Sequence, residues 1–294
     1  MDGDPGRLRR LSAALHRHPG LRLLLLLSVP LAWMVLVYLT SLALLLASSF
    51  WRLNVFTSDV VHDFSLTNFS TLVHEPVYRI VALRTVGLAA AVTVTDIALA
   101  FPLAYYAARV ASPKGRAAIL LAVTIPLWSS YLVRAFAWKL ITTPNGLLNW
   151  LVSSIGIGHL QLGASNWSVW LTFVYLWLPF VILPIYAAIE RVPSSYLEAS
   201  SDLGARGWKT FGRVVWPLVI PGVVAGSIFS FSLTLGDYIV PTLVGNTQFI
   251  GNVIYESVGV SNNVPFGAAY ALVPVLIMAV YLAVARRLGA FEAL

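Results

Sequence analysis

Six apolar runs, each about 20 residues or longer, restrict what this chain can fold into. A helix needs about 20 mostly apolar residues to cross the hydrocarbon core of a bilayer. The chain is 59% hydrophobic and only 11% charged, whereas a soluble domain has about 25% charged residues to cover its surface. We therefore predict an all-α integral membrane protein with six transmembrane helices, at 23–50, 80–108, 117–141, 167–189, 218–240 and 266–285.

The first run follows a polar arm that is rich in arginine, which is also the polarity of a secretory signal peptide. Its apolar length is nearly twice the roughly 7–15 residues of a signal-peptide core. We expect an uncleaved first transmembrane helix. The predicted organisation is an N-terminal arm at 1–22, a first helix at 23–50, an outer segment at 51–79, a core of five helices at 80–287 and a tail at 288–294.

Basic residues orient the predicted helices. Of the 19 Lys and Arg residues, all but five lie in the arm, in 109–116, in the loop 190–217 or after residue 285. Cytoplasmic segments carry such an excess, so both termini and the loop 190–217 are expected to be cytoplasmic. A net charge of +7 would also suit a protein that binds nucleic acid. Here the basic residues form short clusters between the apolar runs, which is better explained by their role in orienting the helices in the membrane, so we expect no nucleic-acid partner. The exceptions are Arg52, Arg79, Arg84, Arg134 and Lys139.

Several chemistries have no motif in this sequence. There is no cysteine, which excludes disulfides and thiolate metal ligands. No G-x-x-x-x-G-K-[ST] loop, no H-E-x-x-H pair and no G-x-S-x-G serine occurs. We therefore expect no catalytic residue, no metal site and no cofactor in this chain.

The loop 190–217 is the one long polar interruption in the second half of the chain. Ser195 and Glu198 form an S-x-x-E capping box, and Gly204 stands where a left-handed C-cap would end the helix. The enclosed helix of about eight residues is roughly 12 Å long, too short to cross a bilayer or to be stable alone. It is either an ordinary capped surface helix or a helix that docks on another surface. A second short helix is expected at 208–215, before Pro217 opens the next run.

The same loop resembles a known pattern. Permeases of bacterial ABC importers carry E-A-A, three residues, G, nine residues, then I-x-L-P in the cytoplasmic loop between the fourth and fifth of six transmembrane helices. Here the matching positions are Glu198, Ala199, Ser200, Gly204, Val214, Trp216 and Pro217, with every spacing kept. Ser200, Val214 and Trp216 depart from the pattern, and Trp216 is the largest departure.

The resemblance extends from about residue 22 to 287 and narrows to the spermidine/putrescine-type permeases, with outer segments like those of the first of their two permease subunits. The stretches that carry it include FPLAYYAAR at 101–109, PLWSSYLVRAFAWKLI at 126–141 and SLTLGDYIVPTLVG at 232–245. Such a family implies a type I importer fold in the bacterial inner membrane. It also implies a second homologous permease, a dimeric ATPase that binds ATP and Mg, an extracytoplasmic substrate-binding protein and membrane lipid as partners.

In that family the loop inserts into a groove of the ATPase as a coupling helix. The resemblance therefore favours docking over an ordinary surface helix, and Glu198 and Gly204 are its leading positions. A glycine allows a tight reversal that a Cβ would strain by about 1 kcal/mol. The expected coupling residues are Tyr196, Leu197, Glu198, Ala199, Asp202, Leu203, Gly204, Ala205 and Arg206.

Two acids in the apolar runs are candidates for a substrate pathway, because an acid there is costly and is often functional. Asp237 lines the mouth of a pathway for a polycation, or it pairs with Arg134 or Lys139. Asp96 serves the pathway, or it joins two helices. The aromatic side chains either hold ammonium groups by cation–π contact or belong to the interfacial belt. The pathway candidates are Asp237, Tyr238, Trp128, Tyr131 and Asp96.

The sequence thus predicts a permease that forms half of a polyamine pathway. An importer for another solute, such as sulfate, iron or a sugar-like compound, is the alternative within the same class. An ion-coupled secondary transporter and a membrane enzyme are the alternatives from other classes, and the enzyme has no visible catalytic constellation.

Overall fold

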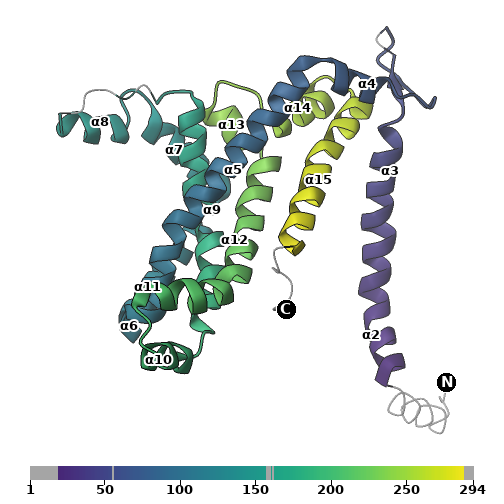
Figure 1. Cartoon of the computed structure of the whole chain (residues 1–294). Helices are drawn as coiled ribbons and strands as arrows, with labels where there is room; N and C mark the ends of the chain where they lie inside the picture. Colours follow the sequence, from purple (N-terminus) through teal and green to yellow (C-terminus); the bar gives the residue numbers. More distant parts are fainter. Residues whose placement is uncertain (1–18, 55, 157–159, 161, 288–294) are drawn as a thin grey trace, which may run out of the picture.

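The structure, a computed structural model, describes residues 19–54, 56–156, 160 and 162–287 (Figure 1). Most of the expected arm 1–22 and all of the tail 288–294 lie outside the described residues. The first apolar run is one continuous helical rod that stands apart from the bundle in Figure 1 and contacts α15 through its last part, α3. None of its most apolar 18-residue window is buried within the chain. The rod consists of α2 (Pro19–Trp33), the π-helical η1 (Met34–Leu39) and α3 (Thr40–Ser48).

A short hairpin follows the rod, so the outer segment is not entirely helical. Strands β1 (Arg52–Leu53) and β2 (Val60–Val61) pair antiparallel, and α4 (Thr67–His74) comes next. The buried Asn68 side chain donates to two backbone carbonyls at the end of the rod, at 2.9 Å each. This bonding holds α4 beside the end of the first helix.

Three long helices form the centre of the bundle. They are α5 (Pro76–Tyr105), which continues as the π-helical η2 (Tyr106–Val110), α9 (Asn166–Glu190) and α12 (Trp216–Gly236), and each packs against the other two. Their apolar side chains bury one another in three clusters along the bundle. Gly222 of α12 lies so close to α9 that an added Cβ would be 2.4 Å from the Cβ of Ala188. Small residues thus allow α9 and α12 to cross closely.

The expected third transmembrane helix at 117–141 is wrong as a single helix. The structure has α6 (Pro113–Thr124) and the 3-10 turn η3 (Ile125–Trp128), then α7 (Tyr131–Thr142) and α8 (Leu147–Ser154), with a bend of 98° at the break. Pro126 lacks a backbone N–H donor, and at the break the N–H and the hydroxyl of Ser129 both donate to the Pro126 carbonyl, at 3.2 Å and 2.7 Å. The described residues contain five helices able to span a membrane, or six if this bent pair counts as one.

The expected break at Pro217 is also absent. Helix α11 (Gly207–Thr210), the π-helical η4 (Phe211–Val215) and α12 run on as one helix. The π-turn accommodates a proline that cannot donate a bond. The helix ends at Gly236, earlier than the expected residue 240, because Asp237 adopts an extended backbone with ψ of 134°.

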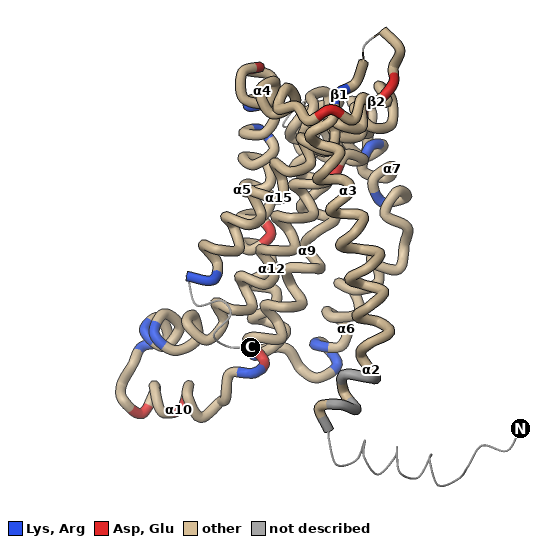
Figure 2. Tube along the Cα trace, turned by 90° about the vertical axis from the view of Figure 1, so that its right-hand side faces the viewer, with Lys and Arg blue, Asp and Glu red and all other residues tan. Residues whose placement is uncertain are grey.

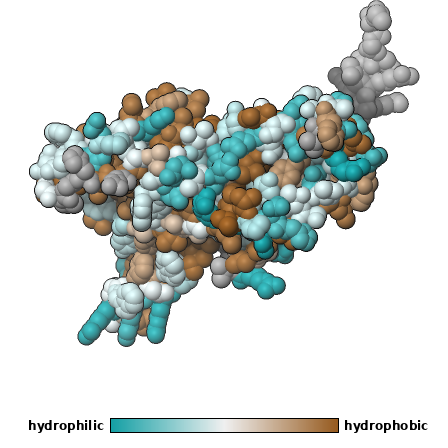
Figure 3. Space-filling model, turned by 90° about the horizontal axis from the view of Figure 1, so that it is seen from above, coloured by the Kyte–Doolittle hydropathy of each residue, from teal (hydrophilic) through white to brown (hydrophobic). Residues whose placement is uncertain are grey.

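The remaining short helices lie at the end of the bundle opposite α10 (Ser194–Asp202), and the long α15 runs back from that end. In Figure 1, α4, α8, α13 and α14 lie at one end, while α6, α10, α11 and the start of α2 lie at the other. Lys and Arg gather near α10 and at the start of α6 in Figure 2. Viewed from above, the opposite end mixes hydrophilic and hydrophobic surface (Figure 3). The helices not yet given are α13 (Ile239–Val244), α14 (Ile250–Tyr255), the π-helical η5 (Glu256–Val260) and α15 (Val264–Arg287).

Candidate functional site

Helix α10 begins two residues earlier than the predicted capping box requires, at Ser194 and not at Tyr196. Pro193 is its N-cap residue, and no side-chain cap hydrogen bond forms there. The backbone N–H of Tyr196 donates instead to the Pro193 carbonyl at 3.2 Å. The predicted capping box of Ser195 and Glu198 is therefore wrong, because Ser195 already lies within the first helical turn and a cap residue must stand before it.

The C-terminal end of α10 confirms the predicted left-handed glycine. Gly204 has φ of +73°, and its N–H donates to the Ser201 carbonyl at 2.8 Å. The N–H of Ala205 reaches back to the Ser200 carbonyl at 3.0 Å. This pair of bonds is a Schellman motif. No atom lies within 4 Å of a Cβ built on Gly204, so backbone conformation, and not crowding, requires glycine here.

The surface of α10 is open to solvent. None of its residues is buried, and Leu203 and Trp208 on either side of the reversal are 88% and 81% exposed. Only Leu197 packs against the core, and the hydroxyls of Ser200 and Thr210 hydrogen-bond at 2.8 Å to join α10 to α11. Large apolar side chains exposed beside a helix with few internal contacts are typical of a surface that binds a partner.

Two cavities adjoin α10. The first, about 550 Å³, lies between α10 and the start of α11–η4, and five of the nine expected coupling residues line it: Tyr196, Ala199, Leu203, Gly204 and Ala205. Glu198, Asp202 and Arg206 are exposed and lie outside this lining. The structure thus places five expected coupling residues in a groove, three charged ones on the outer surface and Leu197 against the core.

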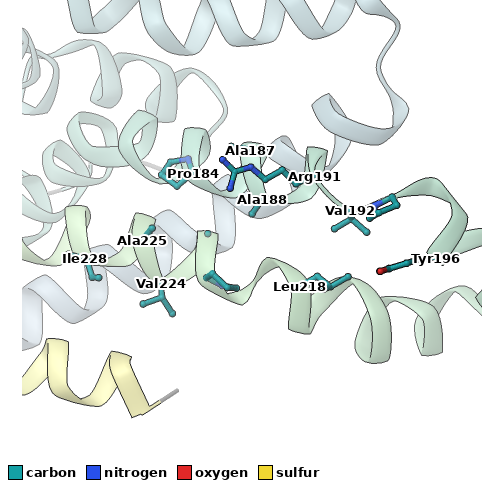
Figure 4. Close-up of a pocket in the computed structure, with 13 residues that line it drawn as sticks. Pro184, Ala187, Ala188, Arg191, Val192, Tyr196, Leu218, Val224, Ala225 and Ile228 are labelled. Carbon is teal, nitrogen blue, oxygen red and sulfur yellow. The ribbon is translucent and has the colours of Figure 1, made fainter. Parts of the chain in front are cut away.

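The second cavity, about 510 Å³, lies between α9 and α12 (Figure 4). Tyr196 belongs to both linings, and Figure 4 shows its hydroxyl directed toward the space between the helices. Sequence reasoning missed this cavity. The signal for it was the prolines and small residues that α9 and α12 place at the same level: Pro184, Ala187, Ala188, Pro221, Gly222 and Ala225.

At the opposite end, Asp237 meets Tyr131 and neither of the expected bases. The Tyr131 hydroxyl donates to Asp237 Oδ2, and the N–H of Val240 donates to Oδ1 at 2.9 Å. Among the described residues the ion pairs do not include Asp237, so the expected pairing with Arg134 or Lys139 is wrong. The reason is geometric, since Tyr131 opens α7 after the break and thereby faces α13.

Of the other pathway candidates, two lie near Asp237 or the break before α7, and one is buried elsewhere. Tyr238 is 37% exposed and stacks on Tyr255 with ring centroids 4.5 Å apart, beside Asp237. Trp128, 90% exposed, precedes the break. Asp96 lies elsewhere, fully buried between α5 and α12, where Ser230 Oγ donates to its Oδ2 at 2.6 Å. Asp96 therefore joins α5 to α12, which is the helix-joining role that the sequence offered as the alternative to a place in the pathway.

Arg134, one of the two bases considered as a partner of Asp237, has an unusual environment. The side chain is buried on α7, and its Nε and Nη1 atoms have no hydrogen-bond acceptor among the described residues. A buried guanidinium normally has an anionic or carbonyl partner.

A helical membrane bundle with a short exposed helix between two of its long helices, α9 and α12, is the arrangement expected of the permease subunit of an ABC importer. Residues 100–291 match the family described as binding-protein-dependent transport system inner membrane component, and the chain belongs to that family. It is therefore a multi-pass protein of the bacterial inner membrane and a non-catalytic subunit, and a separate ATPase subunit hydrolyses ATP. Permeases of this family work with a second permease, an ATPase and a substrate-binding protein.

Curated relatives cover nearly the whole chain. The inner membrane ABC transporter permease protein YdcU of Escherichia coli is 46% identical over 99% of this chain and 96% of the relative. The spermidine/putrescine transport system permease protein PotB of Haemophilus influenzae is 30% identical over 87% and 90%. A solved bacterial alginate ABC transporter, in complex with an alginate pentasaccharide-bound periplasmic protein, has a chain of the same fold. That chain is 18% identical, with a TM-score of 0.73 and coverage of 94% and 96%.

Proposed function

We propose that this chain forms half of the translocation pathway of a polyamine importer and couples to the ATPase through α10. The observation that carries the proposal is the exposed, glycine-ended α10 with Leu203 and Trp208 directed to solvent. In this proposal the α10 end is cytoplasmic, and the basic residues around α10 and α6 support that orientation. Both described ends of the chain lie at this end or point toward it.

The coupling step follows from how α10 is attached. ATP binding closes the ATPase dimer and draws the coupling helices of the two permeases together. Each α10 passes this movement to α9 before it and to α11–α12 after it. Because Gly222 and Ala188 hold α9 and α12 in close contact, the two helices move as a unit, and the bundle changes from inward-open to outward-open.

A polyamine is supported as the substrate by two findings. The PotB relatives are named for spermidine and putrescine and are 30–31% identical. In addition, Asp237 offers a carboxylate that has no basic partner among the described residues, beside the stacked rings of Tyr238 and Tyr255. A carboxylate next to aromatic faces is a suitable environment for an ammonium group.

An anionic solute such as sulfate is the second candidate within the same class. The buried, unsatisfied guanidinium of Arg134 favours it, because a guanidinium binds oxyanions readily and repels a polyamine.

Uptake measurements distinguish these proposals. The complete transporter is reconstituted with its ATPase and binding protein, and uptake of labelled spermidine, putrescine and sulfate is compared. Saturable, ATP-dependent uptake of a polyamine, with no binding of sulfate by the binding protein, is the expected result. The reverse pattern contradicts the polyamine assignment and leaves the importer assignment in place.

The coupling role has its own test. Gly204→Asp and Glu198→Lys are expected to leave a folded permease whose complex no longer links ATP hydrolysis to uptake. Normal uptake and normal stimulation of the ATPase in both variants would contradict the role of α10.

A further inference from the structure

Three helix ends meet directly above α10, and four side chains hold them together. These are Arg109 of η2, Arg116 of α6, and Tyr186 and Glu190 of α9. From the sequence, Arg109 and Arg116 indicated only which side of the membrane is cytoplasmic, because they belong to the excess of basic residues on that side.

Arg109 closes the end of α9. Its guanidinium donates to the carbonyl of Ile189 at 2.7 Å and to the carbonyl of Val192. The last carbonyls of a helix lack partners within the helix, and a cation there also interacts favourably with the helix dipole. Val192 is 4% exposed and directly precedes Pro193, the N-cap residue of α10. Arg109 therefore holds the peptide from which α10 begins.

Arg116 makes the reciprocal connection. Its Nε and Nη2 donate to the carbonyls of Ala107 and Ala108 in η2, at 3.2 Å and 3.0 Å. Its Nη1 lies 3.2 Å from Glu190 Oε1, which also accepts from the Tyr186 hydroxyl at 2.8 Å. The two side chains of the ion pair are 38% and 48% exposed, so their attraction is largely screened by water. The value of these bonds is geometric, because they fix α9 to both η2 and α6.

We propose that Arg109, Arg116 and Glu190 form a transmission bracket that makes α5 and α6 follow α9 when α10 is displaced. The inference rests on the proposed coupling role of α10. Helix α10 itself meets the core only through Leu197 and meets α11 through the Ser200–Thr210 bond, so a displacement of α10 enters the bundle mainly through the peptide that Arg109 holds at the end of α9. The bracket then adds fixed bonds at these helix ends to the side-by-side packing of α5 on α9. The bracket residues position the moving helices and do not contact substrate.

Transport per ATP tests the bracket. Arg109→Gln removes the forked donor, while Lys114→Gln is a matched control, because Lys114 is exposed between the two arginines and loses the same charge. In reconstituted complexes with ATPase and binding protein, Arg109→Gln is expected to retain the ATPase but to lower uptake per ATP hydrolysed at least about fivefold, the lower end of typical coupling factors. Lys114→Gln is expected to match the original chain. Equal uptake per ATP in both variants, or loss of the ATPase from Arg109→Gln complexes, would overturn the proposal.

A second measurement does not require any bracket variant to fold. The chain has no cysteine, so Ser194→Cys on α10 and Ala117→Cys on α6 are its only two spin-label sites and, with partner subunits that also lack cysteine, report a single distance. With the bracket intact, that distance is expected to stay constant between the nucleotide-free and the ATP-bound complex. A distance that changes when the ATPase closes contradicts a rigid connection. If Glu198→Lys and Gly204→Asp uncouple the transporter while the distance changes, only the bracket is wrong. If those two variants leave coupling intact, the proposed role of α10 is wrong.

Discussion

The two ends of this permease differ in how many internal contacts their polar and apolar side chains make. At one end α10 has no buried residue and leaves Leu203 and Trp208 in solvent. At the other end Asp237 receives bonds from Tyr131 and Val240. The first region leaves its surface free of internal contacts, as the proposed docking on the ATPase requires. In the second region the hydrogen bonds of Asp237 hold the fold, although its carboxylate has no basic partner among the described residues. Substitutions near Asp237 should therefore reduce stability, whereas substitutions in α10 should reduce transport at nearly unchanged stability.

The largest loss of stability is expected at Gly251, beside Asp237. A Cβ there would meet the Asp237 carbonyl oxygen at 2.6 Å, and backbone cannot move away as a side chain can. Gly251→Ala should cost about 1–3 kcal/mol by overpacking, seen as a lower Tm of the purified complex. Gly259→Ala is the control, because its nearest neighbour would be Tyr255 at 3.6 Å, an ordinary contact. Equal Tm values for the two variants would show that the Asp237 region is not tightly packed.

Tyr131→Phe should have the next largest effect. The substitution keeps the ring on Trp177, where the centroids are 5.9 Å apart, but removes the donor to Asp237. A buried acceptor left without a donor costs about 1–3 kcal/mol, here reduced because Val240 still donates to the other oxygen. Tyr238→Phe is the matched control, since it removes a hydroxyl from a neighbouring stacked ring and should leave Tm unchanged. A larger loss from the control would assign the structural role to Tyr238.

The two ends also differ in how far the sequence predicted them. Gly204 was predictable because a C-cap depends on residues within one helical turn. The partner of Asp237 was not, since Tyr131, Arg134 and Lys139 all lie on one helix, and only the break at Ser129 decides which of them faces it.

Other long-range features were equally hidden. Whether a proline breaks a membrane helix depends on the bonds that neighbouring groups supply, so Pro126 ended a helix and Pro217 did not. The hydrogen bonds of Arg109 join residues that are 80 or more positions apart along the chain, so no local sequence pattern predicts them.

Gly204→Ala should have a smaller effect on stability and a clear one on transport. The left-handed backbone costs a Cβ residue about 1 kcal/mol, and the open space around Gly204 adds no clash. Relaxing that strain would change the direction of the chain between Leu203 and Trp208 and so shift α10 relative to α11. Uptake per ATP is therefore expected to fall. Gly207→Ala is the control, because its φ is not positive and its surroundings are also open. Unchanged uptake in Gly204→Ala would mean that the reversal tolerates strain.

Glu198→Lys should change stability least and should separate an effect on transport from an effect on stability most clearly. Glu198 is exposed on α10, and no hydrogen bond or ion pair of its side chain occurs among the described residues. Surface substitutions of this kind usually alter stability by no more than about 0.5 kcal/mol. If Glu198 faces the ATPase, reversing its charge should weaken ATPase retention during purification and lower uptake. Glu75→Lys makes the same charge change on an exposed residue that ends α4, at the opposite end of the bundle, and should retain the ATPase. Should Glu198→Lys lower Tm by several degrees while Glu75→Lys does not, α10 would belong to the fold as much as the Asp237 region does, and the contrast between the two ends would disappear.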